Sequence, residues 1–339
     1  MAKRIGKRTI IFENSPKIAG YYSVVGKKEG EGPIGDGFHE VCEDELLGFD
    51  SFERAESELQ RRAVLGALDA AKTKPQNIDC IFAGDLLNQC IGSSFGIGDL
   101  EIPFSGLYGA CSTMALALIN AAVHIDGGAA KEAIAVTSSH FCSAERQYRF
   151  PLEYGSQRPQ SAQWTVTGSG SAVLTAKRGD IAVHSACIGR ICDLGVKDQN
   201  NMGAAMAPAA YDTVRAYLED TETKPDDYDM ILTGDLGLVG SSMFCSLFAR
   251  DGVDITRVHR DCGLLIFDRE RQDVHSGGSG CGCSASVLCS NILNRMNGGE
   301  LKNILFCATG ALLSPTSVLQ GNSIPSIAHL INLRRQDRI

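Results

Sequence analysis

Residues 73–86 read TKPQNIDCIFAGDL, and residues 223–236 read TKPDDYDMILTGDL. The two stretches align without a gap at a constant offset of 150 positions. A second set of identities has a constant offset of 171, in which Gly109, Asn120, Gly127, Gly128 and Lys131 match Gly280, Asn291, Gly298, Gly299 and Lys302. Because these segments are not low in complexity, we interpret them as an internal duplication, with a chance match as the alternative.

The first copy of the repeat has the pattern of an α/β unit. Apolar side chains follow Ser51 at helical spacing, and Ser is favoured at a helix N-terminus. The predicted order is helix, strand, helix, strand over residues 51–72, 80–83, 112–124 and 133–137. This alternation predicts parallel strands with helical crossovers. We therefore expect two similar halves, residues 1–175 and 176–339, packed about a pseudo-twofold axis.

The composition is that of a globular chain. Of the 339 residues 44% are hydrophobic, and the formal net charge of -8 argues against a nucleic-acid-binding surface. The 13 cysteines include no CxxC pair, which predicts reduced thiols in a cytoplasmic setting. No apolar run is long enough for a signal peptide or a membrane-spanning helix. We expect a protein that is soluble or at most peripheral to a membrane.

Cys111 is the best candidate nucleophile. It precedes Ser112 and Thr113 at the expected start of the second helix, where unpaired backbone N–H groups lower a thiol pKa and attract anions. The alternative is a packed thiol that only caps the turn. The duplication places Gly282 at the matching position of the second half, so the two halves have diverged.

Other candidate ligand-binding residues surround this position in the predicted fold. His140 follows the strand 133–137, at the end where α/β proteins bind ligands, and His259 is a weaker candidate. Each histidine is equally well explained as a structural residue. Arg146 belongs to an expected loop, residues 143–155, rich in Arg and Tyr, which suits either a carboxylate ligand or a protein interface. The Gly-rich residues 277–280 are a weak anion-binding signal. Asp85 and Asp235, repeated in both halves, are interpreted as turn or cap residues.

These segments resemble the thiolase and ketoacyl-synthase superfamily, through residues 109–112, 138–140 and 167–172. More closely, the chain resembles the stage V sporulation protein AD family of endospore-forming bacteria. That resemblance runs from about residue 28 to 329 and is carried by residues 28–33, 83–89, 108–113, 144–147, 261–266 and 308–315.

The resemblance implies a thiolase-like fold with an α-β-α-β-α layering. It also implies binding of dipicolinic acid (pyridine-2,6-dicarboxylate), alone or with calcium, and a part in its uptake into the developing spore and its release at germination. Membrane proteins of the same operon are the implied partners, at the spore inner membrane. We further expect a homodimer, no cofactor and no bound metal.

An enzymatic role is not implied by the resemblance. Thiolases have a catalytic His in the loop that here is 275–278 and a second Cys in the loop that here is 308–311, and neither residue is at the matching place. The alternative function is acyl transfer of the ketoacyl-synthase kind through Cys111, with His140 or His259 as base. The predicted ligand set for dipicolinate comprises Cys111, Ser112, Thr113, His140, Asn88, Arg146, Gly278 and His259.

Overall fold

The structure is a computed structural model that describes residues 2–149 and 157–336. Its centre is a mixed β-sheet in the strand order β12-β11-β14-β15-β10-β3-β9-β7-β5-β6. The first half supplies β3 (Lys17–Gly26), β5 (Cys80–Gly84), β6 (Phe104–Gly106), β7 (Glu132–Ser139) and β9 (Gly168–Thr175). The second half supplies β10 (Ile181–Cys187), β11 (Met230–Thr233), β12 (His259–Asp261), β14 (Asn303–Ala311) and β15 (Ser326–Arg335).

Each half repeats one strand arrangement. β5 is parallel to β6 and β7, and β11 is parallel to β12 and β14. The predicted parallel pairing of the repeated strands is confirmed, whereas β9 and β15, which lie outside the predicted elements, run antiparallel to β7 and β14. Ser139 at the end of β7 pairs with Gly168 at the start of β9. The segment that connects them therefore re-enters the sheet at the end where it left, instead of crossing to the opposite end as a parallel connection does.

The duplication extends to individual hydrogen bonds. The Asp79 carboxylate accepts the backbone N–H groups of Lys131 (2.6 Å) and Glu132 (3.1 Å). Asp229, 150 positions later, accepts those of Lys302 (2.7 Å) and Asn303 (2.9 Å). In each half, the carboxylate thus links the repeated turn to the first residues of the strand that follows the second helix of that half. The division of the chain at residue 175 stays a prediction.

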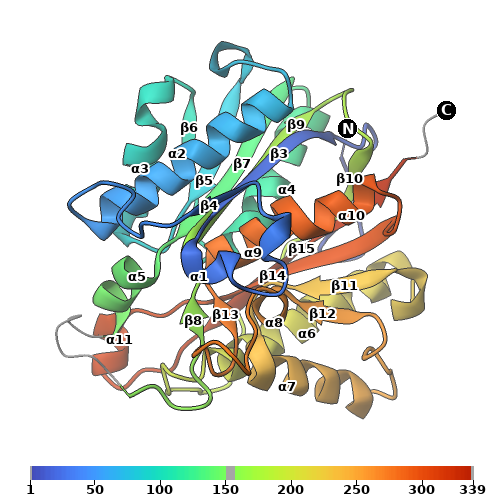
Figure 1. The fold of residues 1–339 in the computed structure, drawn as a ribbon. Coiled ribbons are helices and arrows are strands. Elements are labelled where there is room, and N and C mark those ends of the chain that lie inside the picture. Colours follow the sequence, from blue (N-terminus) through green and yellow to red (C-terminus); the bar gives the residue numbers. More distant parts are fainter. Residues whose placement is uncertain (1, 150–156, 337–339) are drawn as a thin grey trace.

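Helices form three layers around the two halves of the sheet (Figure 1). The outer helix α2 (Phe52–Ala70) packs on β3, β7 and β9 beside α3 (Ile91–Ile97), and α6 (Met202–Thr221) packs on β14 and β15 beside α7 (Gly237–Arg250). Between them, α4 (Thr113–Asp126) touches strands of both halves, with α9 (Cys281–Val287) next to it. This is the expected α-β-α-β-α layering.

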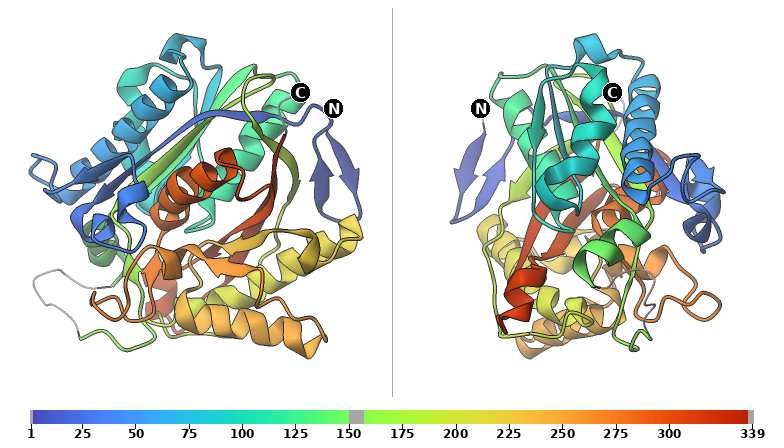
Figure 2. Two further views of the ribbon diagram at one scale, coloured as in Figure 1. Left: turned by 45° about the vertical axis from the view of Figure 1, so that its right-hand side comes forward. Right: turned by 90° about the vertical axis from the view of Figure 1, so that its left-hand side faces the viewer.

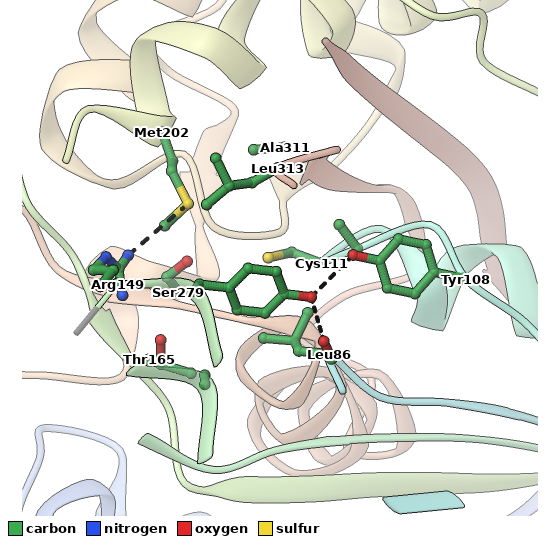
Figure 3. A pocket seen from close by; sticks show the side chains of 12 residues that line it. Leu86, Tyr108, Cys111, Arg149, Thr165, Met202, Ser279, Ala311 and Leu313 are labelled. Atoms are coloured by element: carbon green, nitrogen blue, oxygen red, sulfur yellow. Dashed lines mark hydrogen bonds between the residues drawn. The ribbon is translucent and has the colours of Figure 1, made fainter. Parts of the chain in front are cut away.

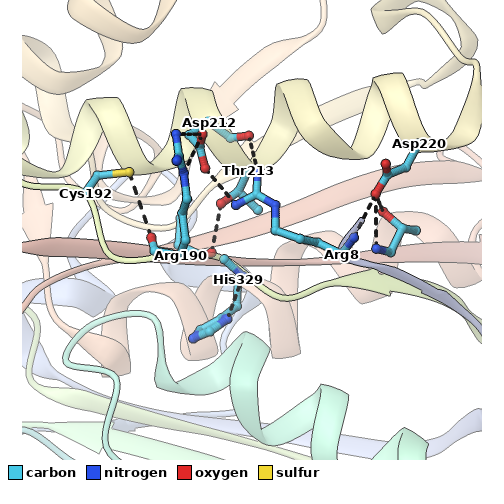
Figure 4. Close-up of polar contacts among 10 residues, drawn as sticks. Arg8, Arg190, Cys192, Asp212, Thr213, Asp220 and His329 are labelled. Atoms are coloured by element: carbon cyan, nitrogen blue, oxygen red, sulfur yellow. Dashed lines mark hydrogen bonds and ion pairs between the residues drawn. The ribbon is translucent and has the colours of Figure 1, made fainter. Parts of the chain in front are cut away.

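An N-terminal hairpin, β1 (Lys3–Ile5) and β2 (Thr9–Ile11), ties the first residues to the second half. Figure 2 shows it at the side of the molecule, against β10 and α6. Asp220 on α6 accepts the backbone N–H of Arg8 (3.1 Å), while Asp212 meets the guanidinium groups of Arg8 (2.8 Å) and Arg190 (2.7 Å) (Figure 4). The hairpin is held by charge-assisted contacts with the middle and the C-terminal end of α6.

Candidate functional site

Cys111 lies at the bottom of a cavity where the two halves meet (Figure 3). Ala110 has a left-handed backbone (φ 49°), which turns the chain sharply into Ser112, the residue before α4. The volume open to the centre of a water molecule is about 30 Å³, enough for about two waters. The lining residues are Leu86, Tyr108, Ala110, Cys111, Ala144, Tyr148, Arg149, Thr165, Met202, Ser279, Ala311 and Leu313.

The electrostatic surroundings of Cys111 are opposite to the expectation. Burial raises the pKa of the Cys111 thiol well above its usual value, and the neighbouring Asp235 carboxylate raises this pKa further. The helix start does not compensate, because the Ser112 and Thr113 N–H groups already donate to Gly109 O (3.1 Å) and Ala110 O (3.3 Å). The prediction of an activated thiol is therefore wrong.

Asp235 holds the turn before α9, in keeping with the expected turn or cap role, and also contacts Cys111. Its carboxylate accepts hydrogen bonds from the Thr309 hydroxyl (2.7 Å), the Gly280 N–H (2.9 Å) and the Ser279 hydroxyl (3.0 Å), and it also faces the Cys111 thiol. Its counterpart Asp85 also holds a turn, accepting the Leu87 N–H at 2.8 Å. Both carboxylates thus hold turns, as the repeat suggested, and Asp235 has the additional contact with Cys111.

Tyr148 and Arg149, two residues of the expected Arg- and Tyr-rich loop that the predicted ligand set did not include, line the cavity. α5 (Phe141–Tyr148) replaces the first part of the expected loop; residues 150–155 of that loop lie outside the described residues. Tyr148 donates to Leu86 O and lies 3.1 Å from the Tyr108 hydroxyl. Arg149, with a side chain only 7% exposed, pairs with Glu145. The spacing of Ala144 and Tyr148, four residues apart, is the signal that identifies this helix face.

The structure separates both histidines from the cavity. His140 precedes α5, where Nδ1 accepts the Cys142 N–H (3.2 Å) and Nε2 lies 2.9 Å from Glu45 O. A carbonyl only accepts, so Nε2 carries the proton and neither ring nitrogen is left for a ligand. His259 contacts Thr233 Oγ1 (3.0 Å), and burial lowers its pKa to about 4. Both are structural residues in this fold.

Asn88 and Arg146 lie together, but in another pocket of about 340 Å³ on the opposite face of α5. Arg146 forms an ion pair with Glu53 there, and Gln147 accepts the Asn88 N–H (3.0 Å). Gly278 belongs to β13 (Gly278–Ser279), and its carbonyl accepts from Gln163 (2.8 Å). Of the predicted ligand set, only Cys111 lines the cavity, with Ser112 and Thr113 following it in the chain, while Asn88 and Arg146 line the other pocket.

Two further findings concern metals and membranes. Within residues 2–149 and 157–336, no cluster of three or more His, Cys, Asp and Glu side chains has the arrangement of a metal site. None of the helices in the same described part of the chain is long and apolar enough to cross a membrane.

Comparisons with known proteins agree on a family and a fold. The family model described as stage V sporulation protein AD matches residues 6–334. A curated relative, the stage V sporulation protein AD of Bacillus subtilis (strain 168), is 44% identical over 333 residues, 98% of this chain and 98% of the relative.

Several solved structures share the thiolase-like fold at low sequence identity. The 3-oxoacyl-[acyl-carrier-protein] synthase III of Aquifex aeolicus VF5 has a TM-score of 0.57 at 13% identity, covering 94% of this chain and 99% of that one. OleA of Xanthomonas campestris with bound cerulenin has a TM-score of 0.59 at 14% identity, covering 96% and 97%. ChlB3, an acyltransferase, has a TM-score of 0.60 at 14% identity, covering 95% and 98%.

Proposed function

The chain belongs to the stage V sporulation protein AD family, and we propose that it binds dipicolinic acid in the Cys111 cavity without transforming it chemically. The observation that carries this proposal is the buried Arg149 guanidinium at a cavity with aromatic and apolar walls. Arginine recognises a carboxylate through two parallel hydrogen bonds, and Tyr108 and Tyr148 offer ring faces to a flat ligand.

The cavity must open to admit a pyridine dicarboxylate, because about 30 Å³ suffices only for water. Tyr148 is the side chain that has to move, which breaks its hydrogen bonds to Leu86 O and the Tyr108 hydroxyl. The ligand carboxylate then competes with Glu145 for Arg149. The Thr165 hydroxyl is a donor for the second carboxylate, whereas the Ser279 hydroxyl would first have to leave Asp235, to which it donates. These local donors have to outweigh the repulsion of a dianion by a net charge of -8.

The absence of acyl-transfer catalysis is part of the proposal, supported by the neighbours of Cys111. A catalytic cysteine reacts as the thiolate, which a nearby base or cation stabilises. Here burial and the Asp235 carboxylate keep the thiol protonated, and His140 and His259 are too far to serve as bases because neither lines the cavity. Mass spectrometry after incubation with acetyl-CoA or malonyl-CoA separates the two functions, since only a catalyst would carry an acyl group on Cys111.

The test of the site is a pair of variants on one helix turn. Arg149→Gln should raise the dissociation constant for dipicolinate about tenfold or more, because a charge-assisted contact is worth roughly 1.5–3 kcal/mol. Arg146→Gln should leave the constant unchanged, because Arg146 faces the other pocket and pairs with Glu53. Calorimetric titration of both purified variants, with and without calcium, measures the effect.

A double variant guards against a folding artefact. Arg149→Gln leaves Glu145 buried without its cation, so Arg149→Gln combined with Glu145→Gln should restore the fold by circular dichroism but not the affinity. Equal affinity of the parent and the Arg149 variants would place the dipicolinate site elsewhere.

We propose that the protein acts in the forespore, in dipicolinate uptake and its release at germination, with the membrane proteins of the same operon. Binding to those partners would hold it peripherally at the inner membrane. Fractionation of forespores with and without the partner proteins tests this, because the chain should move to the soluble fraction when they are missing.

We also propose a homodimer formed through the edge of the sheet. β6 pairs only with β5 among the described strands, and its Phe104 is exposed; Ile91 and Phe95 on α3 are exposed as well, Phe95 by 75%. An unpaired edge strand beside exposed apolar residues favours pairing with a second copy. Light scattering should give a dimer mass for the parent and a monomer mass for Phe104→Glu. A parent that is monomeric at micromolar concentration would contradict the proposal.

A further inference from the structure

A buried polar network lies directly behind the cavity wall. Glu56 on α2 accepts hydrogen bonds from Ser143 of α5 (2.6 Å) and from Ser138 at the end of β7 (3.3 Å). Asp85 at the end of β5 accepts the hydroxyl (2.6 Å) and N–H (2.7 Å) of Ser93 on α3. Both acids are fully shielded from solvent. The network therefore joins α2, α3, α5, β5 and β7 through two carboxyl groups.

Gln60 connects the two acids. Its Nε2 lies within hydrogen-bonding distance of Ser93 Oγ (3.1 Å), Ser138 Oγ (3.2 Å) and Gly84 O (3.2 Å). Because the Gly84 carbonyl can only accept a hydrogen bond, the Gln60 amide places Nε2 towards Gly84, and Oε1 lies on the opposite side of the amide group. Oε1 is buried and has no donor among the described residues. A protonated Glu56, one helical turn away, would be a donor on the same helix.

The charged groups around Glu56 do not neutralise the two buried acids, Glu56 and Asp85. The groups that face it are Asp85, the Cys281 thiol of α9, and Glu53 of α2, whose charge is matched by Arg146 of α5. Glu145 of α5 is matched by Arg149, and β3 and β9 present Tyr22 and Val173 to α2. The hydrogen bonds that reach Glu56 and Asp85 come from hydroxyl and backbone groups, not from a cation. Two adjacent buried carboxylates without a cation are strongly disfavoured.

We propose that Glu56 and Asp85 share one proton and that this proton couples ligand binding in the Cys111 cavity to pH. The coupling has a short structural route, because Leu86 follows Asp85 and Ala144 follows Ser143, and both line the cavity. The coupling rests on the proposed dipicolinate site, whereas the proton shared by Glu56 and Asp85 does not depend on that site.

The direction of the coupling follows from charge. Burial and the neighbouring Asp85 raise the pKa of Glu56 to about 8. A bound dianion raises the pKa of the pair further, since it disfavours a second negative charge nearby. The affinity for dipicolinate should therefore fall about tenfold between pH 7 and pH 9, and binding near pH 8.5 should take up protons from the buffer.

Titration calorimetry in buffers of different ionisation enthalpy measures that proton uptake. Glu56→Gln should bind dipicolinate with an affinity independent of pH and take up no proton. The control is Asp69→Asn, which removes an exposed carboxylate from the same helix and should behave like the parent. An unchanged pH dependence in Glu56→Gln would overturn the coupling.

Thermal unfolding tests for the shared proton in the absence of a ligand. The folded pKa of Glu56 is raised, so the unfolded chain releases the proton first and parental stability falls as pH rises from about 4.5 to about 8. The melting temperature of the parent should fall by about 5 °C relative to Glu56→Gln over pH 5–8. Parallel pH curves for the two proteins would refute the shared proton. If the curves diverge but neither protein binds dipicolinate at any pH, the coupling fails together with the proposed function.

Discussion

Gly282→Ala should lower the free energy of unfolding by about 3 kcal/mol or more, because the added methyl group has no space. Gly282 lies in the first turn of α9, packed against β7 and β9. A Cβ built there would overlap the Gly168 carbonyl oxygen and come within 2.8 Å of Ser139 N. Both are backbone atoms of paired strands, so relieving the overlap requires moving the sheet or the helix.

Urea unfolding followed by circular dichroism measures this loss. The matched control is Gly98→Ala, since nothing lies within 4 Å of a Cβ built at Gly98 and its backbone is helical. The control should change stability by less than about 1 kcal/mol. If Gly282→Ala were as stable as the control, the close packing of α9 on β7 and β9 would not be a constraint on this position.

The same contact explains why the two halves diverged. By the offset of the repeat, Gly282 matches Cys111, yet a cysteine at 282 would meet the strand backbone that Gly168 and Ser139 provide. Only the first half has space for a thiol at this position, where the chain turns through Ala110 before α4 begins. One cavity with one thiol is the consequence of this packing.

The sequence predicted the regular elements of the first half closely. The helix expected at 51–72 is α2, and the Ser51 hydroxyl accepts the Arg54 N–H at 3.4 Å. The strand expected at 80–83 is β5. These predictions succeeded because apolar spacing and capping are local properties. The antiparallel direction of β9 was missed, since it depends on where a long connection returns.

The site was less predictable because residues of both halves build it. Met202, Ser279 and Leu313 reach the cavity from the second half, far from Cys111 in the sequence. In this segment the sequence favoured Arg146, but Arg146 on α5 faces the other pocket, and Arg149, the residue after α5, lines the cavity. The pKa of Cys111 depends on burial and on Asp235, and neither follows from the position of the cysteine at a helix start.

Asp235→Asn should make the Cys111 thiol at least about ten times more reactive towards iodoacetamide at pH 8. The Asp235 carboxylate raises the pKa of Cys111, so replacing it with a neutral amide lowers that pKa and increases the thiolate fraction. One pKa unit corresponds to a tenfold change in thiolate while the thiol is mostly protonated. The amide oxygen still accepts from donors such as Thr309, so the variant should remain folded.

Peptide mass spectrometry follows the alkylation of Cys111 separately from the other 12 cysteines. Restricted access to the cavity lowers the rate by the same factor in both proteins, so the ratio of the two rates isolates the charge effect. Asp85→Asn, the counterpart in the first half, serves as the control. Its rate of Cys111 alkylation should equal that of the parent, because Asp85 bonds to Leu87 and Ser93 and not to the thiol. Equal rates for the parent and Asp235→Asn would show that burial alone keeps Cys111 protonated. A faster rate would mean that the same carboxylate which helps to position Ser279 and Gly280 also prevents the thiol from acting as a nucleophile.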